Sequence, residues 1–113
     1  DMKRYSHLLA GASWMAEYGD PDTADWSFIQ TFSPYHLFDA KKDYPPTIFM
    51  TSTKDDRVHP AHARKMMAMM EAAGKDVRYY ENIEGGHGGA ANNAQSAHMT
   101  ALAYTFLWQQ LAK

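Results

Sequence analysis

The second half of the chain alternates short apolar runs with longer amphipathic stretches. Residues 47–52 (TIFMTS) are rich in β-branched and apolar side chains, and the run is too short for a helix, which predicts a buried strand. Residues 77–83 (VRYYENI) predict a second strand. Between them, after Pro60 and before Gly74, apolar side chains recur at helical spacing, which predicts an amphipathic helix carrying Ala63, Met66, Met67, Met70 and Ala73.

A second long helix is predicted for residues 94–111, after a glycine-rich loop. Its apolar side chains share one helical face, formed by Ala97, Ala101, Tyr104, Trp108 and Leu111. The resulting order is strand, helix, strand, helix. This order predicts an α/β fold with parallel strands alternating with helices, because a helical crossover returns the chain in the same direction.

The pattern in the first half is weaker. Residues 3–16 are weakly helical, with Gly11 as an interruption. Residues 26–29 predict a short helix that Asp22 or Thr23 caps and that ends before the next Ser-Pro pair. No internal repeat or low-complexity linker divides the sequence, so we treat residues 1–113 as one unit.

Composition narrows the classes of function. The 113 residues are 45% hydrophobic and 13% aromatic, which is typical of a globular domain with a core. The 11 Lys and Arg residues are interspersed with 13 Asp and Glu residues, which argues against nucleic acid or a membrane surface as a partner. Cysteine is absent, which excludes disulfides and thiolate zinc sites and leaves the compartment open. No apolar run approaches the roughly 20 residues needed to span a bilayer, so we expect a soluble protein.

Two loops carry the candidate chemistry. KDDRVHP follows the first predicted strand and GGHGG follows the second, so both should lie at the carboxyl edge of the sheet, where open α/β folds bind ligands. The glycines around His87 would let a substrate approach the imidazole closely. Asp55 or Asp56 could then orient His87 as a general base.

Each candidate has a structural alternative. His87 could be an ordinary loop histidine, and either aspartate could cap the following helix or pair with Arg57. Trp14 and Tyr18 are four residues apart, a spacing that is more often found in a core than in a pocket. The methionines of KMMAMM are interpreted as packing residues. The remaining histidines show no metal-binding spacing: His7, His36, His59, His62 and His98.

An acid followed by a histidine near the end of an α/β chain is the order found in α/β hydrolases. Their nucleophile precedes both residues and lies in a G-x-S-x-G turn, a motif that these 113 residues lack. His87 and Asp55 could move protons without a nucleophile, but they could not form an acyl-enzyme.

Three segments together resemble one family. TKDDRVHPAHARK at residues 53–65, EGGHGG around His87, and GASWMAEYGDP at residues 11–21 resemble the C-terminal part of the peptidase domain of prolyl oligopeptidases, serine peptidases with an α/β-hydrolase fold. Either half of the combination D-D-R-V-x-P and E-G-G-H-G would be modest support alone, whereas the two together are specific.

The resemblance implies a role for each candidate residue. It makes Asp55 the acid of a catalytic triad, His87 the general base, and Arg57 a guanidinium that binds a substrate carbonyl. Trp14 and Tyr18 would line a proline-binding pocket, with Val58 in its wall. The resemblance implies neither a metal nor a cofactor, and it implies a short peptide as the partner.

Residues 1–113 are therefore expected to be a C-terminal fragment of such a catalytic domain, with the serine supplied by sequence before Asp1. The intact enzyme would hydrolyse short peptides after proline, or act as an esterase or acyl-aminoacyl peptidase on the same fold. The segment GGAANNAQSA resembles a bacterial branch of the family, so a bacterial source is expected, with the compartment, cytoplasm or periplasm, left open. The isolated chain would be inactive and would self-associate, because its strands and the helices of Met70 and Trp108 would lack neighbours.

Overall fold

The two predicted strands pair as expected. The computed structural model describes residues 1–112, in which β1 (Thr47–Ser52) and β2 (Val77–Asn82) form a parallel two-stranded sheet. Their register runs from Thr47 opposite Val77 to Ser52 opposite Asn82. The second strand ends one residue earlier than predicted, and Ile83 is 71% exposed. The expectation that the first strand is buried is wrong for residues 47–51, which are half-buried, because β1 pairs with β2 alone within residues 1–112.

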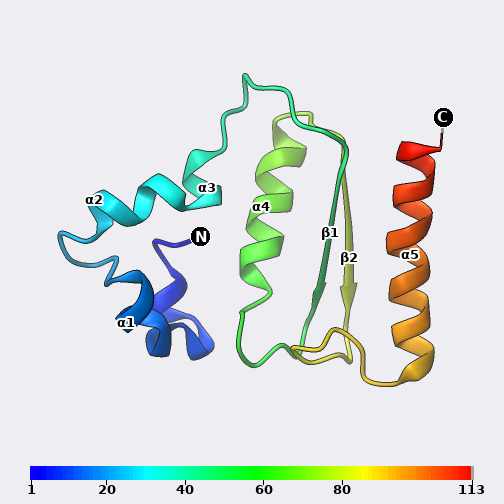
Figure 1. Cartoon of the computed structure of the whole chain (residues 1–113), viewed down its shortest axis with the longest axis horizontal. Helices are drawn as coiled ribbons and strands as arrows, with labels where there is room; N and C mark the ends of the chain where they lie inside the picture. Colours follow the sequence, from blue (N-terminus) through cyan, green and yellow to red (C-terminus); the bar gives the residue numbers. More distant parts are fainter. Residues whose placement is uncertain (113) are drawn as a thin grey trace.

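The two long helices lie on opposite sides of the sheet (Figure 1). α4 (Ala61–Ala72) follows the predicted pattern, with Met70 buried and Gly74 in the left-handed region just after the helix. α5 (Asn93–Leu111) begins one residue before its predicted start. The Asn92 side chain caps it by accepting a hydrogen bond from the Gln95 N–H at 2.9 Å.

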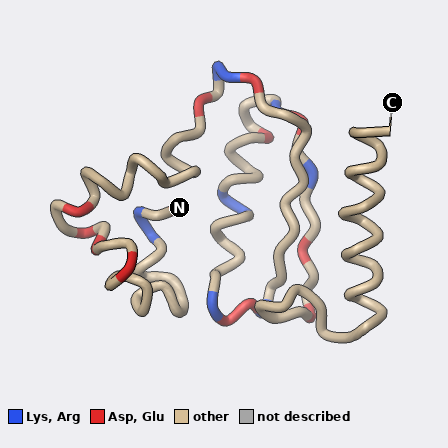
Figure 2. Tube along the Cα trace, in the orientation of Figure 1, with Lys and Arg blue, Asp and Glu red and all other residues tan. Residues whose placement is uncertain are grey.

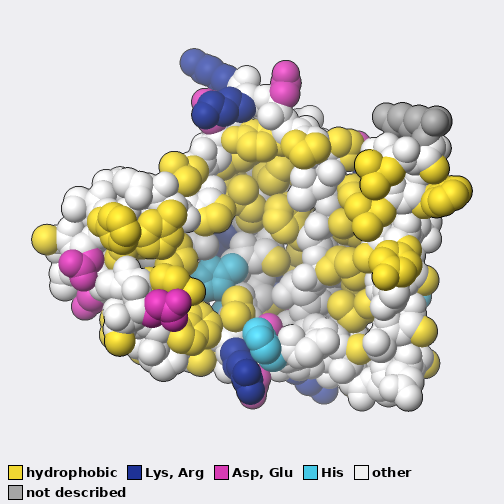
Figure 3. All heavy atoms as spheres, in the orientation of Figure 1, with side chains coloured by type: hydrophobic (Ala, Val, Ile, Leu, Met, Phe, Trp, Pro, Cys, Tyr) yellow, Lys and Arg dark blue, Asp and Glu magenta, His cyan; other side chains and the backbone are white. Residues whose placement is uncertain are grey.

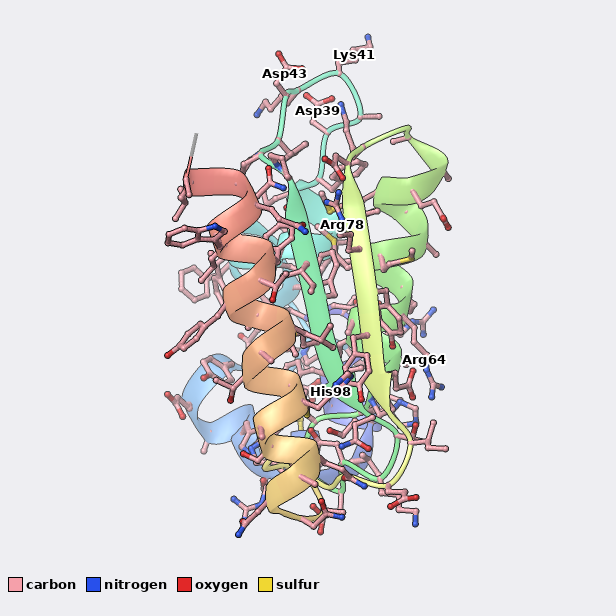
Figure 4. The ribbon with its side chains drawn as sticks, turned by 90° about the vertical axis from the view of Figure 1, so that its right-hand side faces the viewer. Asp39, Lys41, Asp43, Arg64, Arg78 and His98 are labelled. Atoms are coloured by element: carbon pink, nitrogen blue, oxygen red, sulfur yellow. The ribbon has the colours of Figure 1, made fainter. Side chains whose placement is uncertain are left out.

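The apolar face of α5 is exposed. Figure 4 shows α5 running across one side of the two strands. Phe106 is buried and its ring lies 5.5 Å from the Arg78 guanidinium of β2, whereas Trp108 is 74% exposed. No Lys, Arg, Asp or Glu occurs in α5 (Figure 2), and hydrophobic side chains gather over its C-terminal half (Figure 3). We define the α5 stripe as Tyr104, Leu107, Trp108 and Leu111.

The N-terminal residues do not form the predicted single helix. The chain instead forms two 3₁₀ helices (Tyr5–His7 and Leu9–Trp14) followed by α1 (Met15–Tyr18). Leu8 is extended and Leu9 has a φ of 49°, which breaks the helical path. A Cβ at Gly11 would lie 1.7 Å from the Tyr5 carbonyl oxygen, so this glycine permits the two 3₁₀ helices to pack closely.

The next segment lies beyond α4, on the side away from the strands (Figure 1). α2 (Trp26–Ile29) forms as predicted and continues as a 3₁₀ helix (Gln30–Phe32), but neither predicted cap forms. The Asp22 carboxylate instead pairs with Lys3 and His7, which lie far away in the sequence.

A further helix was not predicted from the sequence. α3 (Pro34–Leu37) starts at the Ser-Pro pair that we interpreted as a stop, because proline fits the first turn of a helix. The loop that follows carries Asp39, Lys41 and Asp43 at the end of the sheet opposite the carboxyl ends of the strands (Figure 4). Within residues 1–112, no helix combines the length and hydropathy needed to cross a bilayer.

Candidate active site

The carboxyl ends of β1 and β2 bring the two predicted loops together (Figure 1). The Lys54 N–H, in the loop after β1, donates a hydrogen bond to the Gly85 carbonyl at 3.1 Å. We call residues 83–92, which connect β2 to the helix cap, the His87 loop. This backbone contact places Asp55 directly beside that loop.

Asp55 and His87 form a direct pair. Both carboxylate oxygens of Asp55 lie 3.0 Å from His87 Nδ1. Oδ1 of Asp55 also accepts hydrogen bonds from the backbone N–H groups of Arg57, at 2.9 Å, and Val58, at 3.0 Å. The carboxylate is thus held by its own loop and presented to the imidazole.

These contacts keep the Asp55 carboxylate ionised and select one tautomer of the neutral His87 imidazole. Burial raises the pKa of Asp55, but the hydrogen bonds from Arg57, Val58 and His87 outweigh it, and the pKa lies below its ordinary value. An ionised carboxylate only accepts hydrogen bonds, so Nδ1 of His87 carries the proton. In the neutral imidazole, Nε2 is then a hydrogen-bond acceptor, as a general base requires.

Accessibility differs between the two members of the pair. The His87 side chain is 45% exposed, whereas that of Asp55 is 11% exposed. The carboxylate is therefore the inner member of the pair and the imidazole the outer one, the arrangement that a general base and its orienting acid require. Asp56 is the alternative acid considered from the sequence. It is exposed, and within residues 1–112 its carboxylate forms no hydrogen bond with His87.

The glycines of the His87 loop permit a tight turn. The Gly89 N–H donates to the Gly86 carbonyl at 2.9 Å, with His87 inside the turn, and Gly89 has a φ of 90°. A Cβ at Gly85 would lie 2.0 Å from the Gly89 carbonyl oxygen. Side chains are therefore excluded where the two ends of the turn meet.

An aromatic pocket lies near residues 53–60, which connect β1 to α4 and which we call the acid loop. A cavity of about 530 Å³ is bordered by Trp14, Tyr18 and Val58, so the structure brings the three predicted pocket residues together. Its other lining residues include Tyr5, Glu17, Phe32 and His62. Burial lowers the pKa of His62 to about 4, so this histidine is neutral near neutral pH.

Tyr5 supports this pocket and was not identified from the sequence. Its ring is 2% exposed, stacks on Trp14 with centroids 6.4 Å apart, and meets Tyr18 edge-on at 6.0 Å. Its hydroxyl donates to the Gly19 carbonyl at 2.5 Å. Tyr5 precedes Trp14 by nine residues in an irregular segment, so no helical or strand periodicity links the two residues.

One backbone hydrogen bond joins the aromatic segment to the acid loop. The Ala10 N–H donates to the Arg57 carbonyl at 3.3 Å. The Arg57 side chain is exposed and forms no ion pair with any residue between 1 and 112, which argues against the structural alternative from the sequence. Its guanidinium is therefore exposed to solvent.

A polar cluster fixes the start of the acid loop. Glu81 of β2 accepts hydrogen bonds from Thr53 and Tyr79, each at 2.7 Å, and from Arg64 Nε at 3.0 Å. Arg64 reaches it from α4 (Figure 4). The Arg64 hydrogen bond outweighs the effect of burial and lowers the pKa of Glu81 to about 2. The loop is thereby fastened two residues before Asp55.

Within residues 1–112, the site contains an acid and base pair and no cluster of metal ligands. Among residues 1–112, no group of three or more His, Cys, Asp or Glu side chains is arranged to hold a metal ion. The geometry instead supports proton transfer at His87 Nε2 beside an apolar pocket.

Comparison with known proteins identifies the family. The sequence model of the prolyl oligopeptidase family matches residues 1–113. The chain belongs to this family. An uncharacterized peptidase of Sinorhizobium fredii is 51% identical over 112 residues, which cover 98% of this chain and 15% of that protein. The chain thus spans about one seventh of the length of this relative.

Solved prolyl oligopeptidases share the fold. A post-proline cleaving enzyme from Rickettsia typhi has a TM-score of 0.86 and 34% identity, covering 99% of this chain and 16% of that one. Prolyl oligopeptidase B from Galerina marginata, bound to a 35-residue hydrolysis and macrocyclization substrate, has a TM-score of 0.87 at 23% identity, covering 98% of this chain and 16% of that one. These neighbours are α/β-hydrolase domains, so the predicted fold class is confirmed. The prolyl oligopeptidase family consists of serine peptidases, which confirms the predicted enzyme class at family level.

Proposed function

We propose that residues 1–113 form the C-terminal part of the catalytic domain of a serine peptidase that cleaves short peptides after proline. The observation that carries the proposal is the Asp55–His87 pair, with His87 Nδ1 3.0 Å from both carboxylate oxygens and the His87 side chain 45% exposed. The likeness to a post-proline cleaving enzyme supports the choice of substrate.

In this proposal a serine from the longer protein attacks the carbonyl carbon of the scissile peptide bond. His87 Nε2 takes the proton of the serine hydroxyl and then delivers it to the leaving amine, which breaks the C–N bond and leaves an acyl-enzyme. Water, deprotonated by the same nitrogen, hydrolyses the acyl-enzyme and restores the serine. Asp55 holds the proton on Nδ1 and stabilises the imidazolium formed in each step.

The aromatic pocket would bind the proline residue. Trp14 would stack on the pyrrolidine ring, with Tyr18 and Val58 forming adjacent walls of the same cavity. The unpaired Arg57 guanidinium would donate hydrogen bonds to a carbonyl of the substrate backbone. In these roles, the apolar pyrrolidine ring of the substrate would occupy the apolar cavity.

Replacing Trp14 with Ala in the full-length enzyme tests the substrate assignment. We expect kcat/KM for a proline-containing peptide to fall about threefold to tenfold more than kcat/KM for a simple ester, because ring stacking contributes about 0.5–1.5 kcal/mol beyond area burial. Steady-state kinetics on both substrates measures this difference. Trp26→Ala is the matched control, since Trp26 is outside the pocket lining and should affect both substrates equally. Equal losses in Trp14→Ala would favour an esterase.

The isolated 113-residue chain should be inactive and self-associated. It lacks a G-x-S-x-G nucleophile turn, and the exposed α5 stripe together with the unpaired strand edges favours association. Met70 is buried, so α5 rather than α4 should supply the interface expected from the sequence. We expect a dimer or larger species in sedimentation velocity over a range of concentrations, and no turnover of a Gly-Pro chromogenic substrate.

The control for this experiment is Trp108→Glu, which places a charge in the α5 stripe and should shift the chain toward monomer. A compact wild-type monomer at high concentration would contradict the association. Turnover that survives repurification and is abolished by His87→Ala would contradict the inactivity.

A further inference from the structure

Ser52 and Asn82 end the two strands side by side, and both are almost fully buried. They are opposite each other at the last position of the parallel register and are 2% and 4% exposed. Buried polar side chains are destabilising unless their hydrogen bonds are satisfied. Neither residue belongs to the Asp55–His87 pair or lines the aromatic pocket, so their burial requires another explanation.

The Asn82 amide uses its full hydrogen-bonding capacity, mostly on the His87 loop. Its Oδ1 accepts from the backbone N–H groups of Glu84, at 3.0 Å, and Gly85, at 3.3 Å. Its Nδ2 donates to the Gly89 carbonyl at 3.0 Å and to Gln95 Oε1 at 2.9 Å. Backbone N–H donors face Oδ1 and a backbone carbonyl faces Nδ2, so only one of the two flipped orientations of the Asn82 amide satisfies these hydrogen bonds.

Ser52 and Gln95 form further hydrogen bonds with the His87 loop. The Ser52 hydroxyl donates to the same Gly89 carbonyl at 2.8 Å. Oε1 of Gln95, which Asn82 contacts, also accepts from the Ala91 N–H at 2.8 Å. The His87 loop is therefore held at its start, its middle and its end by side chains centred on Asn82.

The same strand ends determine the position of both members of the catalytic pair. His87 lies between Gly85 and Gly89, two of the loop positions that Asn82 contacts, while the Asp55 N–H donates to the Ser52 carbonyl at 3.3 Å. We infer that Asn82 is a positioning residue that holds the His87 imidazole in line with Asp55. This inference rests on the proposed function of His87 as general base.

Asn82→Asp is the sharpest test because it keeps the shape of the side chain and removes its donor. At alkaline pH the new carboxylate faces the Gly89 carbonyl and repels it, so the loop should shift. We expect kcat of the full-length enzyme to fall about 10-fold to 100-fold on its alkaline plateau, with KM changed less than about twofold, because a displacement of the order of 1 Å in a catalytic group has effects of this size.

The pH dependence separates positioning from a simple charge effect. Burial raises the pKa of a carboxyl, and the protonated form can again donate to Gly89, so the activity of the variant relative to wild type should rise as the pH falls. A negative charge acting on His87 through space would instead raise the pKa of the imidazole, and the relative activity would fall as the pH falls. Measuring kcat across the acid limb and the plateau therefore distinguishes the two effects.

Two controls and one substitute variant accompany this test. Asn93→Asp makes the same change at the exposed start of α5, outside the loop contacts, and should stay within about twofold of wild type. The amplitude of titration with a serine-directed phosphonate gives the fraction of folded enzyme, independently of the rate. If Asn82→Asp fails to fold, Ser52→Ala removes one donor to Gly89 and should lower kcat about fivefold.

The outcomes are distinct. A folded Asn82→Asp enzyme with wild-type kcat on the plateau would overturn the positioning role, as would a relative activity that falls with falling pH. Where the first variant does not fold, wild-type kcat in Ser52→Ala would overturn it. His87→Ala distinguishes failure of this inference from failure of the proposed function. Full activity of His87→Ala would refute the role of His87 as general base. Loss of activity in His87→Ala together with normal activity in Asn82→Asp would refute only the positioning role of Asn82.

Discussion

His87→Ala should lower kcat of the full-length peptidase by about 10⁴-fold to 10⁶-fold, because it removes the proposed general base, which would take the serine proton and return it to the leaving amine. Asp55→Asn should lower kcat by about 10³-fold to 10⁴-fold, since an amide facing Nδ1 favours the wrong imidazole tautomer. Single-turnover kinetics with a proline-containing substrate measures the acylation step directly in both variants.

Asp56→Asn is the matched control for the acid. Asp56 is exposed and adjacent to Asp55 in sequence, yet the structure directs only Asp55 to His87 within residues 1–112. We expect its kcat to stay within about threefold of wild type. A larger loss in Asp56→Asn than in Asp55→Asn would show that the acid is wrongly assigned.

Gly85→Ala should lower kcat/KM more than about 100-fold, because the new Cβ would lie 2.0 Å from the Gly89 carbonyl oxygen and the turn around His87 could not close. The displaced atoms are backbone, so no side-chain rotation relieves the clash. The same crowding should destabilise the fold by about 1–3 kcal/mol. Steady-state kinetics and the rate of thermal inactivation measure the two effects.

Gly88→Ala provides the comparison within the same loop. A Cβ at Gly88 would meet no heavy atom within 4 Å, so its thermal inactivation should match that of wild type. If both alanine variants were equally stable, the close approach of Gly85 and Gly89 would not be a requirement of the loop.

The sheet and its two long helices could be predicted because their patterns are local. Residues 47–52 and 77–82 are bounded by breakers and contain the β-branched and aromatic residues that strands favour. α4 shows the apolar spacing of a helix and ends beside a glycine. Placing both loops at the carboxyl edge followed from topology, and the contact between Asp55 and His87 agrees with it.

The remaining features depend on contacts between distant residues. The 3₁₀ helices near Tyr5 follow from its packing between Trp14 and Tyr18, which no periodic pattern indicates. Pro34 was interpreted as a stop although it starts α3, because proline is compatible with either position. Asn82 was assigned only to a strand, since its role depends on the folded loop that it contacts.

The buried polar pair at the strand ends also has a consequence for folding specificity. The hydrophobic pattern alone specifies the register of these two strands only weakly, because residues 47–51 of β1 are no more than half-buried. A slip of one residue would separate Ser52 from Asn82 and leave a buried amide without its loop partners, each unmade hydrogen bond costing about 1–3 kcal/mol. The hydrogen bonds that assemble the His87 loop therefore also select the native register. A chain that pairs its strands in a slipped register would lose these hydrogen bonds and would not form the turn around His87.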